Sequence, residues 1–187
     1  MENKIKIGLG VPTNRGVKTD TALSLMRLVA HSKYDYQIIV STRGYNTAEN
    51  RNRIVAQAVK GDCDYLLLTD DDMVYEPDCL DRLLAHKKDI VGATYNTKYE
   101  TQTKVIEHLD GEKEELFKCK ALGGGLLLVK IEVFMTVKQP HFGYKWHDNG
   151  MVSMSNDWFF CEKAIEAGFE IYCDPTLKVG HIGSYQF

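Results

Sequence analysis

The stretch that decides the fold runs from Tyr65 to Leu84 and reads YLLLTDDDMVYEPDCLDRLL. Its apolar run at residues 65–68 is typical of a buried strand, and Pro77 stands where proline is favoured, in the first turn of a helix. Between them Asp70, Asp71 and Asp72 repel one another unless a hard cation or hydrogen bonds neutralise them. Because ligands of open α/β sheets bind at the carboxyl ends of strands, we expect a metal site in a ligand crevice.

Strand-like and helix-like segments alternate on both sides of this stretch. The expected strands cover residues 4–11, 37–40, 65–68 and 89–95, and the expected helices begin near Thr19 or Asp20, at Thr47 and at Pro77. The first helix is expected to carry Leu23, Met26 and Ala30 at helical spacing, with Leu25, Leu28 and Val29 widening the apolar stripe. This order predicts a parallel sheet covered by helices on both faces, which the strand at 89–95 continues.

The pattern changes after residue 95. Asp110 and Gly111 predict a hairpin between residues 104–109 and 112–118, and a buried strand follows at 126–129. Residues 139–155 have no sustained period, which in a compact domain is typical of a functional loop. A helix capped by Ser155 or Asn156, with Cys161, Ala164 and Ile165 facing inward, precedes short strands at 169–173 and 177–182. We therefore predict one α/β domain over residues 1–187, a three-layer α/β/α sandwich with a mixed central sheet.

Composition excludes few classes of protein but narrows the choice. Of 187 residues 44% are hydrophobic and 26% charged, and the net charge of −3 gives no basic field for nucleic acid. No apolar run approaches the ~18 residues that span a bilayer, and the N-terminus lacks the apolar core of a signal peptide. We expect a soluble cytoplasmic protein whose five scattered cysteines are reduced and mostly buried.

Four segments in this order resemble small glycosyltransferases of the GT-A fold, close to family 2. They are LLLTDDD with PDCLDRLL, the strand and helix GGGLLLVKIEVF, the helix start NDWFFCEKAIEAGFEIYCDP, and the closing LKVGHIG. The resemblance covers nearly the whole chain and implies a nucleotide-binding half at about residues 1–95 and an acceptor-side half at about 96–187. The activity it implies is metal-dependent transfer of a sugar from a nucleoside-diphosphate sugar to a hydroxyl acceptor.

The resemblance also assigns the acids. It implies that Asp72 binds the metal, that Asp70 holds the ribose or a metal-bound water, and that Asp71 belongs to the donor site. His181 is the expected imidazole ligand, and oxygen ligands with one imidazole suit Mn²⁺ or Mg²⁺. Such a cation would stabilise the departing diphosphate as a Lewis acid. The alternatives are a solvated turn for the acids and a structural role for the histidine.

Asp157 is the candidate base that takes the proton of the acceptor hydroxyl in an inverting transfer. The family usually has an acidic pair here, whereas this chain has Asn156 and Asp157. The alternative is that the carboxylate only complements the helix N-terminus.

The nucleotide is expected over the ends of the first two strands. Pro12, Thr13 and Arg15 match the family's first loop, and Arg43 follows the second strand, where no acid is present to read uracil. UDP or GDP is thus expected from family frequency alone. Arg51, with Asn52, resembles the family's Arg-Asn pair and could bind the diphosphate, or could lie on a solvated helix face.

Two further features concern the sugar and the acceptor. Gly123, Gly124 and Gly125 could let a sugar approach the backbone or could form a plain turn, and we expect Gly124 and Gly125 in the donor site. Trp146 and His147 could stack on an acceptor sugar or anchor the loop. Acceptor identity and oligomeric state leave no signal in the sequence.

Two other functions remain open from the residues. The first is a sugar- or nucleotide-binding protein that kept the fold without turnover, since fold alone does not establish activity. The second is a sugar-nucleotide nucleotidyltransferase, which usually begins with a Gly-rich, Lys/Arg-bearing loop after the first strand. Gly8-Leu9-Gly10 lies too early and is too apolar to serve as that loop.

Overall fold

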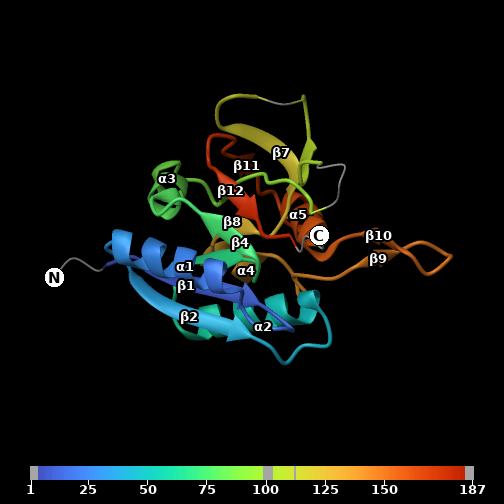
Figure 1. Ribbon diagram of the computed structural model, residues 1–187. Helices are drawn as coiled ribbons and strands as arrows, with labels where there is room; N and C mark the ends of the chain where they lie inside the picture. The colour runs from blue at the N-terminus through green and yellow to red at the C-terminus, as the bar shows by residue number, and fades with distance from the viewer. Residues whose placement is uncertain (1–3, 99–102, 112, 184–187) are drawn as a thin grey trace, which may run out of the picture.

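An eight-stranded mixed sheet forms the centre of the protein (Figure 1). The computed structural model describes residues 4–98, 103–111 and 113–183. The strands of the sheet are β1 (Lys6–Pro12), β2 (Asp35–Ser41), β3 (Tyr65–Thr69), β5 (Ile90–Gly92), β6 (Ile106–His108), β7 (Phe117–Leu122), β8 (Leu126–Lys130) and β11 (Ile171–Cys173). Their order is β2-β1-β3-β8-β5-β11-β7-β6, so the predicted mixed α/β sheet is confirmed.

The parallel part of the sheet is smaller than the sequence predicted. β1 pairs in parallel with β2 and β3, but β8 lies between β3 and β5 and is antiparallel to both. The expectation that β5 directly continues the parallel run is therefore wrong. The run Leu126–Val129 of β8 is buried along its whole length, which suits the centre of a sheet better than its edge.

Helices cover both faces of the sheet. One face carries α2 (Thr47–Lys60), α4 (Ile131–Thr136) and α5 (Asn156–Glu166), and the other carries α1 (Thr19–His31) and α3 (Cys79–Ala85). The alternation of strand β3 separates the two cores, because Leu66 and Leu68 pack in the first and Leu67 in the second. The three layers predicted from the sequence are thus present (Figure 1).

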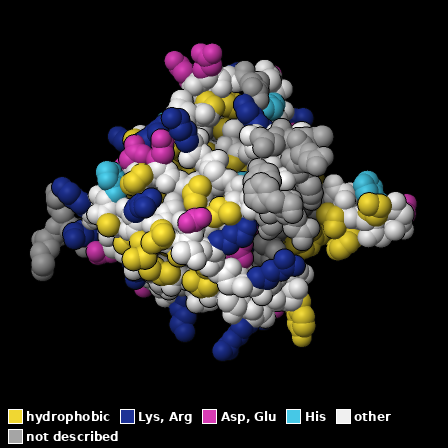
Figure 2. All heavy atoms as spheres, viewed as in Figure 1, with side chains coloured by type: hydrophobic (Ala, Val, Ile, Leu, Met, Phe, Trp, Pro, Cys, Tyr) yellow, Lys and Arg dark blue, Asp and Glu magenta, His cyan; other side chains and the backbone are white. Residues whose placement is uncertain are grey.

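The predicted inner face of α1 is right for Leu25 and Leu28 but wrong for Leu23 and Met26. Leu23 and Met26 are 45% and 67% exposed, whereas Thr21, Ser24, Leu25 and Leu28 are buried. The Ser24 hydroxyl accepts a hydrogen bond of 2.8 Å from the Tyr75 amide, so a polar residue lies on the core face and hides its period from a hydrophobicity pattern. Hydrophobic side chains accordingly gather on the surface over α1 in Figure 2.

The inner face of α5 is only partly as expected. Cys161 and Ala164 are buried together with Phe160, but Ile165 is 44% exposed and does not face the core as predicted. All five cysteines are free and buried, which confirms the expectation that they are mostly buried and not linked in disulfides.

A short ribbon joins the acids to the C-terminal part of the chain. β4 (Met73–Tyr75), which the sequence did not predict, pairs antiparallel with β12 (Val179–His181), and Met73 stands opposite His181. The Ile182 amide also donates to the Asp72 carbonyl at 2.8 Å. This pairing brings His181 next to Asp72 although 109 positions separate them in the sequence.

Two hairpins complete the fold. β6 and β7 pair antiparallel as predicted, but their connection runs over residues 109–116 rather than a two-residue turn at Asp110-Gly111. Residues 113–115 are charged and exposed and do not alternate, and residue 112 lies outside the described ranges. Within the expected loop at 139–155, β9 (Lys145–Trp146) and β10 (Val152–Met154) form a hairpin that projects from the body (Figure 1).

Across the described residues, no helix has the length and apolar character needed to cross a membrane.

Candidate active site

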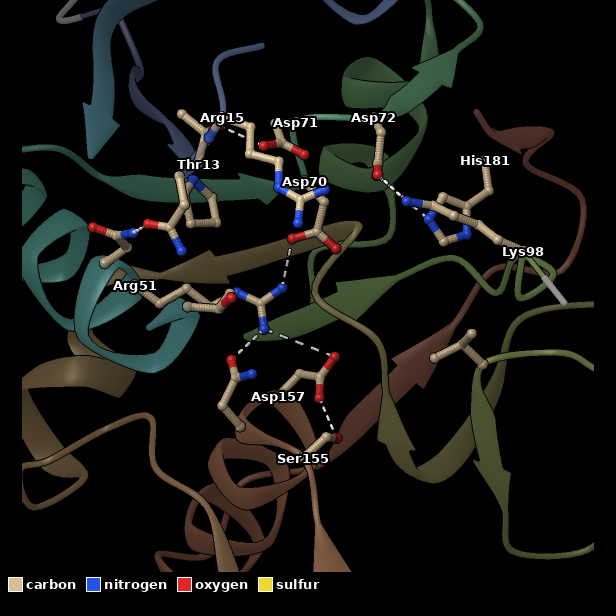
Figure 3. Close-up of a pocket in the computed structure, with 16 residues that line it drawn as sticks. Thr13, Arg15, Arg51, Asp70, Asp71, Asp72, Lys98, Ser155, Asp157 and His181 are labelled. Carbon is tan, nitrogen blue, oxygen red and sulfur yellow. Dashed lines mark hydrogen bonds and ion pairs between the residues drawn. The ribbon is translucent and has the colours of Figure 1, made fainter. Parts of the chain in front are cut away.

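The carboxyl ends of the neighbouring strands β1 and β3 meet at one edge of the sheet and open into a cavity of about 510 Å³ (Figure 3). Its lining combines the loops after β1 and β3 and the first turns of α2 with Lys98, Val105, the start of α5 and the end of β12. The lining residues are Pro12, Thr13, Asn14, Arg15, Thr47, Asn50, Arg51, Asp70, Asp71, Asp72, Lys98, Val105, Ser155, Asn156, Asp157 and His181. Most of the residues that the sequence assigned to donor, metal or base therefore share one cavity.

The first loop is tied to the acids. The Thr13 hydroxyl donates a hydrogen bond to the Asp71 carboxylate and accepts one of 2.9 Å from the Gly16 amide (Figure 3). Pro12 and Arg15 line the cavity on either side of this contact. Arg43, by contrast, is exposed and is not among the lining residues, so the structure does not bring it to the site.

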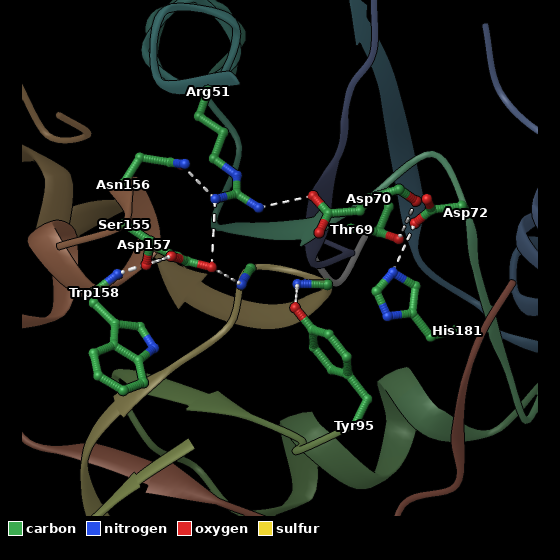
Figure 4. Close-up of polar contacts among 12 residues, drawn as sticks. Arg51, Thr69, Asp70, Asp72, Tyr95, Ser155, Asn156, Asp157, Trp158 and His181 are labelled. Atoms are coloured by element: carbon green, nitrogen blue, oxygen red, sulfur yellow. Dashed lines mark hydrogen bonds and ion pairs between the residues drawn. The ribbon is translucent and has the colours of Figure 1, made fainter. Parts of the chain in front are cut away.

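Arg51 is the buried centre of the site, with 2% of its side chain exposed. Its Nη2 forms an ion pair of 2.7 Å with Asp70, while Nη1 donates to the Asn156 side chain and lies 3.8 Å from Asp157 (Figure 4). The alternative of a solvated helix face is therefore wrong for Arg51. Its neighbour Asn52 instead accepts hydrogen bonds from the backbone amides of His141 and Phe142 and so holds the start of the projecting loop.

Burial and charge act together on this ion pair. Burial raises the pKa of the Asp70 carboxyl, and Arg51 counteracts that rise without cancelling it. Burial lowers the pKa of the Arg51 guanidinium, but the carboxylates of Asp70 and Asp157 outweigh it and the pKa is raised. The guanidinium is thus a permanent positive charge between two acids on different elements.

Gly124 makes room for this arginine. A Cβ at Gly124 would lie 2.3 Å from Arg51 Nη2, and one at Gly125 would lie 2.7 Å from the Tyr95 ring. All three glycines of the run 123–125 are buried. Their backbone is therefore approached by protein side chains, and this accounts for the glycines without a ligand.

Asp157 faces Arg51 from the first turn of α5. Its Oδ2 accepts a hydrogen bond of 3.0 Å from the Gly124 amide, and its Oδ1 accepts from the Ser155 hydroxyl and, at 3.1 Å, from the Trp158 amide (Figure 4). Three hydrogen-bond donors thus hold the carboxylate at the N-terminus of α5, where it lines the cavity. The geometry is compatible with a base and with a helix-capping acid alike.

Asp72 meets two basic groups. Lys98 Nζ contacts its Oδ2 and His181 Nε2 lies 3.3 Å from its Oδ1 (Figure 3). Burial raises the pKa of Asp72, but the hydrogen bonds from His181 and Lys98 outweigh burial and lower the pKa to about 2.

The orientation of His181 suits a cation ligand. Its Nδ1 lies 3.0 Å from the carbonyl oxygen of Asn96, and because a carbonyl oxygen only accepts, Nδ1 carries a proton there. Nε2 is then directed at Asp72 Oδ1, where it donates to the carboxylate when it carries a proton and can bind a cation in place of that proton. A backbone carbonyl on the second ring nitrogen is the usual support of a metal-binding histidine.

Asp70, which was expected to hold the ribose or a metal-bound water, stands apart from this pair. Asp70 is turned to Arg51, and among the residues that the structure describes no group of three or more His, Cys, Asp or Glu side chains could hold a metal ion. Asp72 and His181 together offer one oxygen and one nitrogen donor, so they fit a divalent cation whose other ligands come from water or substrate.

Several site residues escaped the sequence. Lys98 follows a short strand with no periodic or motif signal, and only the fold brings it to Asp72. Asn50 is buried at the start of α2, where its side chain binds Ser41, Gly44 and Asn14 and ties the first two loops together. Tyr95 belongs to no recognisable motif in the sequence either, yet its hydroxyl accepts a hydrogen bond of 3.1 Å from the Gly125 amide. Asn156 could have been found, because it replaces an acid at a motif position.

Comparisons with known proteins agree with this geometry. The family model of glycosyl transferase family 2 matches residues 14–140. The crystal structure of A197 from STIV has a TM-score of 0.66 at 19% identity, over 96% of this chain and 86% of that chain. A crystal structure of GalNAc-T7 with UDP, GalNAc and Mn2+ has a TM-score of 0.64 at 12% identity, over 97% of this chain and 44% of that chain. No curated protein matches the sequence.

The mixed sheet, with the acids at the end of β3 opening into a polar cavity, has the GT-A fold, consistent with both solved structures. Since the family match covers more than half of the 187 residues, the chain belongs to glycosyl transferase family 2. A nucleotide sugar is the donor expected of this family.

Proposed function

We propose that the protein is a metal-dependent, inverting glycosyltransferase that moves a sugar from a UDP- or GDP-linked donor to a hydroxyl acceptor. The observation that carries this proposal is the position of Arg51. Its guanidinium lies between Asp70 at the end of β3 and Asp157 at the start of α5, so one buried cation fixes a donor-side acid and an acceptor-side acid relative to each other. A two-substrate transfer needs such fixed relative placement.

Asp157 is the proposed catalytic base. Its carboxylate lines the cavity, and hydrogen bonds from Gly124, Ser155 and Trp158 hold it in a fixed position from which a carboxylate can take a proton. The acceptor hydroxyl would lose its proton to Asp157 as its oxygen attacks the anomeric carbon, and the electrons of the glycosidic bond would leave with the diphosphate. Attack from the side opposite the leaving group inverts the anomeric configuration.

The donor would lie along the first loop and the acids. Pro12, Thr13 and Arg15 border the cavity, and the tie between Thr13 and Asp71 holds this loop against the strand end. Arg15 is the nearest candidate for the diphosphate, because Arg51 is already occupied by carboxylates. Asp70, paired with Arg51, is proposed to hold the ribose.

Asp72 and His181 are the proposed metal ligands. The orientation of His181, with Nδ1 on the Asn96 carbonyl and Nε2 toward Asp72, supports this role. A bound Mn²⁺ or Mg²⁺ would neutralise charge that develops on the leaving diphosphate. The GalNAc-T7 structure, which has the same fold, contains UDP and Mn2+.

The test is release of nucleoside diphosphate from a panel of UDP- and GDP-sugars, with and without Mn²⁺ and a panel of sugar acceptors. For Asp157→Asn we expect a loss of about 10²- to 10⁴-fold in turnover with donor affinity unchanged, the usual contribution of a general base. Asp148→Asn, which replaces an exposed acid on the projecting hairpin, is the matched control and should turn over normally.

Three results would contradict parts of the proposal. Full turnover in Asp157→Asn would contradict the role of Asp157 as the catalytic base. Turnover that persists in the presence of a chelator would contradict the proposed metal dependence. Donor binding without release, with every sugar and acceptor of the panel, favours instead a sugar- or nucleotide-binding protein on the same fold.

A further inference from the structure

Lys98 is the side chain in this cavity whose placement the proposed function leaves unexplained. Its ammonium contacts Asp72 Oδ2, while His181 approaches the other carboxylate oxygen. Asp72 is thus enclosed by a basic group on each oxygen (Figure 3). Lys98 therefore stands at the carboxylate that the proposed metal would need.

The ammonium and a divalent cation compete for the same carboxylate. Two cations a few ångströms apart repel, and the repulsion is strongest where solvent is partly excluded. The Asp72 side chain is mostly buried, whereas that of Lys98 is 36% exposed. The Lys98 ammonium can therefore move away to water or to an anion while the Asp72 carboxylate stays in place.

The surroundings give the ammonium a place to go. A second hollow of about 550 Å³ adjoins the first and shares Arg15, Asp71, Asp72 and Lys98 with it. Lys98 lines both, so its ammonium has open space on the side of Arg15, the residue proposed for the diphosphate.

The charge of the site points in the same direction. The cavity is lined by four carboxylates, those of residues 70–72 and 157, and by the positively charged side chains of Arg15, Arg51 and Lys98. A lone divalent cation would gain little at a site that is almost neutral, and a lone diphosphate would meet an excess of carboxylates. When the cation and the diphosphate bind together, their charges offset each other, because the diphosphate pairs with Lys98 and the metal ion binds Asp72.

We propose that Lys98 is a displaceable internal cation of Asp72, which makes binding of a divalent metal ion and of the donor diphosphate mutually dependent. This inference rests on the proposed function, because it takes Asp72 as a metal ligand. By linkage, the factor by which the diphosphate raises metal affinity equals the factor by which the metal raises diphosphate affinity. Lys98 should set the size of that factor.

The experiment measures Mn²⁺ binding to the purified protein by electron paramagnetic resonance of free Mn²⁺, with and without UDP, against a protein-free titration of UDP. Four proteins are compared: wild type, Lys98→Met, Lys98→Arg and Lys118→Met. Lys98→Met removes the charge, Lys98→Arg retains it, and Lys118→Met removes an exposed ion pair with Glu170 on the distant strand β7. Melting curves establish that each variant is folded, and Lys98→Gln serves if Lys98→Met is not.

We expect Lys98→Met to bind Mn²⁺ without UDP at least about tenfold more tightly than wild type, which corresponds to about 1.4 kcal/mol. With UDP present this advantage should vanish, so the coupling factor falls in Lys98→Met and is retained in Lys98→Arg and Lys118→Met. Equal Mn²⁺ affinity of wild type and Lys98→Met without UDP would overturn the inference.

Failure here and failure of the proposed function are distinguishable. If no protein of the set binds Mn²⁺ even with UDP, both the role of Lys98 and the metal requirement are wrong, while diphosphate release from donor sugars still decides whether the protein is a transferase. If Mn²⁺ binds equally to all four proteins and stimulates release, the transferase stands and the role of Lys98 falls.

Discussion

Arg51 Nη2 lies 2.7 Å from Asp70 Oδ1, an ion pair in which the arginine side chain is almost wholly buried. The same guanidinium reaches Asn156 and Asp157, so three segments of the chain share one positive charge (Figure 4). The Arg51 guanidinium is shielded from solvent, and its contacts fix the positions of Asp70 and Asp157 relative to each other. This relationship leads to the first prediction.

Replacing Arg51 by Met should destabilise the protein strongly. The substitution leaves Asp70 and Asp157 without their shared counter-charge, and loss of one partner of a buried pair costs about 3–5 kcal/mol. Urea unfolding measures the effect. Arg53→Met is the control on the same helix, because Arg53 is 46% exposed and pairs with Glu49 four residues earlier, and it should change stability little. Equal losses in the two variants would contradict a buried structural role for Arg51.

Replacing Gly124 by Ala should disturb the same guanidinium from the opposite side. The new Cβ would lie 2.3 Å from Arg51 Nη2, and relieving such overpacking typically costs about 1–3 kcal/mol. Thermal unfolding and donor turnover should both fall. Gly61→Ala is a fitting comparison, because its Cβ would meet the movable end of the Gln37 side chain and should be tolerated better. A variant Gly124→Ala as stable as Gly61→Ala would show that Arg51 adapts freely.

Acid should weaken the protein through Asp72. Burial raises the pKa of Asp72, but hydrogen bonds from His181 and Lys98 outweigh burial and lower the pKa from an ordinary 3.8 to about 2. A carboxyl whose pKa is lower in the folded state contributes stability above its ordinary pKa and loses it as pH falls toward the folded value. The contribution is at most about 2 kcal/mol, and is reduced by solvent screening because Lys98 is partly exposed.

The measurement is the free energy of unfolding against pH, from neutral down to about pH 2.5. Asp72→Asn should show a shallower decline than wild type below about pH 4, whereas Asp148→Asn should follow the wild-type curve. Parallel curves for wild type and Asp72→Asn would mean that Asp72 has no lowered pKa.

Replacing Trp146 by Ala should affect the acceptor and not the donor. Trp146 is 61% exposed on the projecting β9–β10 hairpin, which leads through Ser155 into Asp157, and the hairpin carries further hydrophobic side chains on its surface (Figure 2). We expect a raised KM for the acceptor, unchanged donor hydrolysis and unchanged stability. Met135→Ala removes an equally exposed apolar side chain from α4 and is the control. A raised KM for the donor, or lost stability, would contradict an acceptor role.

Residue patterns predicted much of this fold because local rules and tertiary packing agree there. The helix expected to begin at Thr47 was confirmed at that residue, and the acids follow a buried strand as predicted. The predicted inner face of α1 was only partly right, because two polar residues, Thr21 and Ser24, are buried there and Ser24 accepts a hydrogen bond from the Tyr75 amide. The prediction that β5 directly continues the parallel run was wrong because β8, which is buried along its length, lies between β3 and β5 and is antiparallel to both.

The stretch Tyr65–Leu84 by itself determined a buried strand, three carboxylates at its end and a helix beyond, since these follow from hydrophobicity, spacing and proline placement. It could not determine which partner neutralises each acid, because charges separated by tens of residues meet only after folding. In the tertiary structure Asp71 accepts a hydrogen bond from Thr13, Asp70 pairs with Arg51, and Asp72 pairs with Lys98 and His181. The sequence identified the acids as a cluster, and packing divided them into three different electrostatic environments.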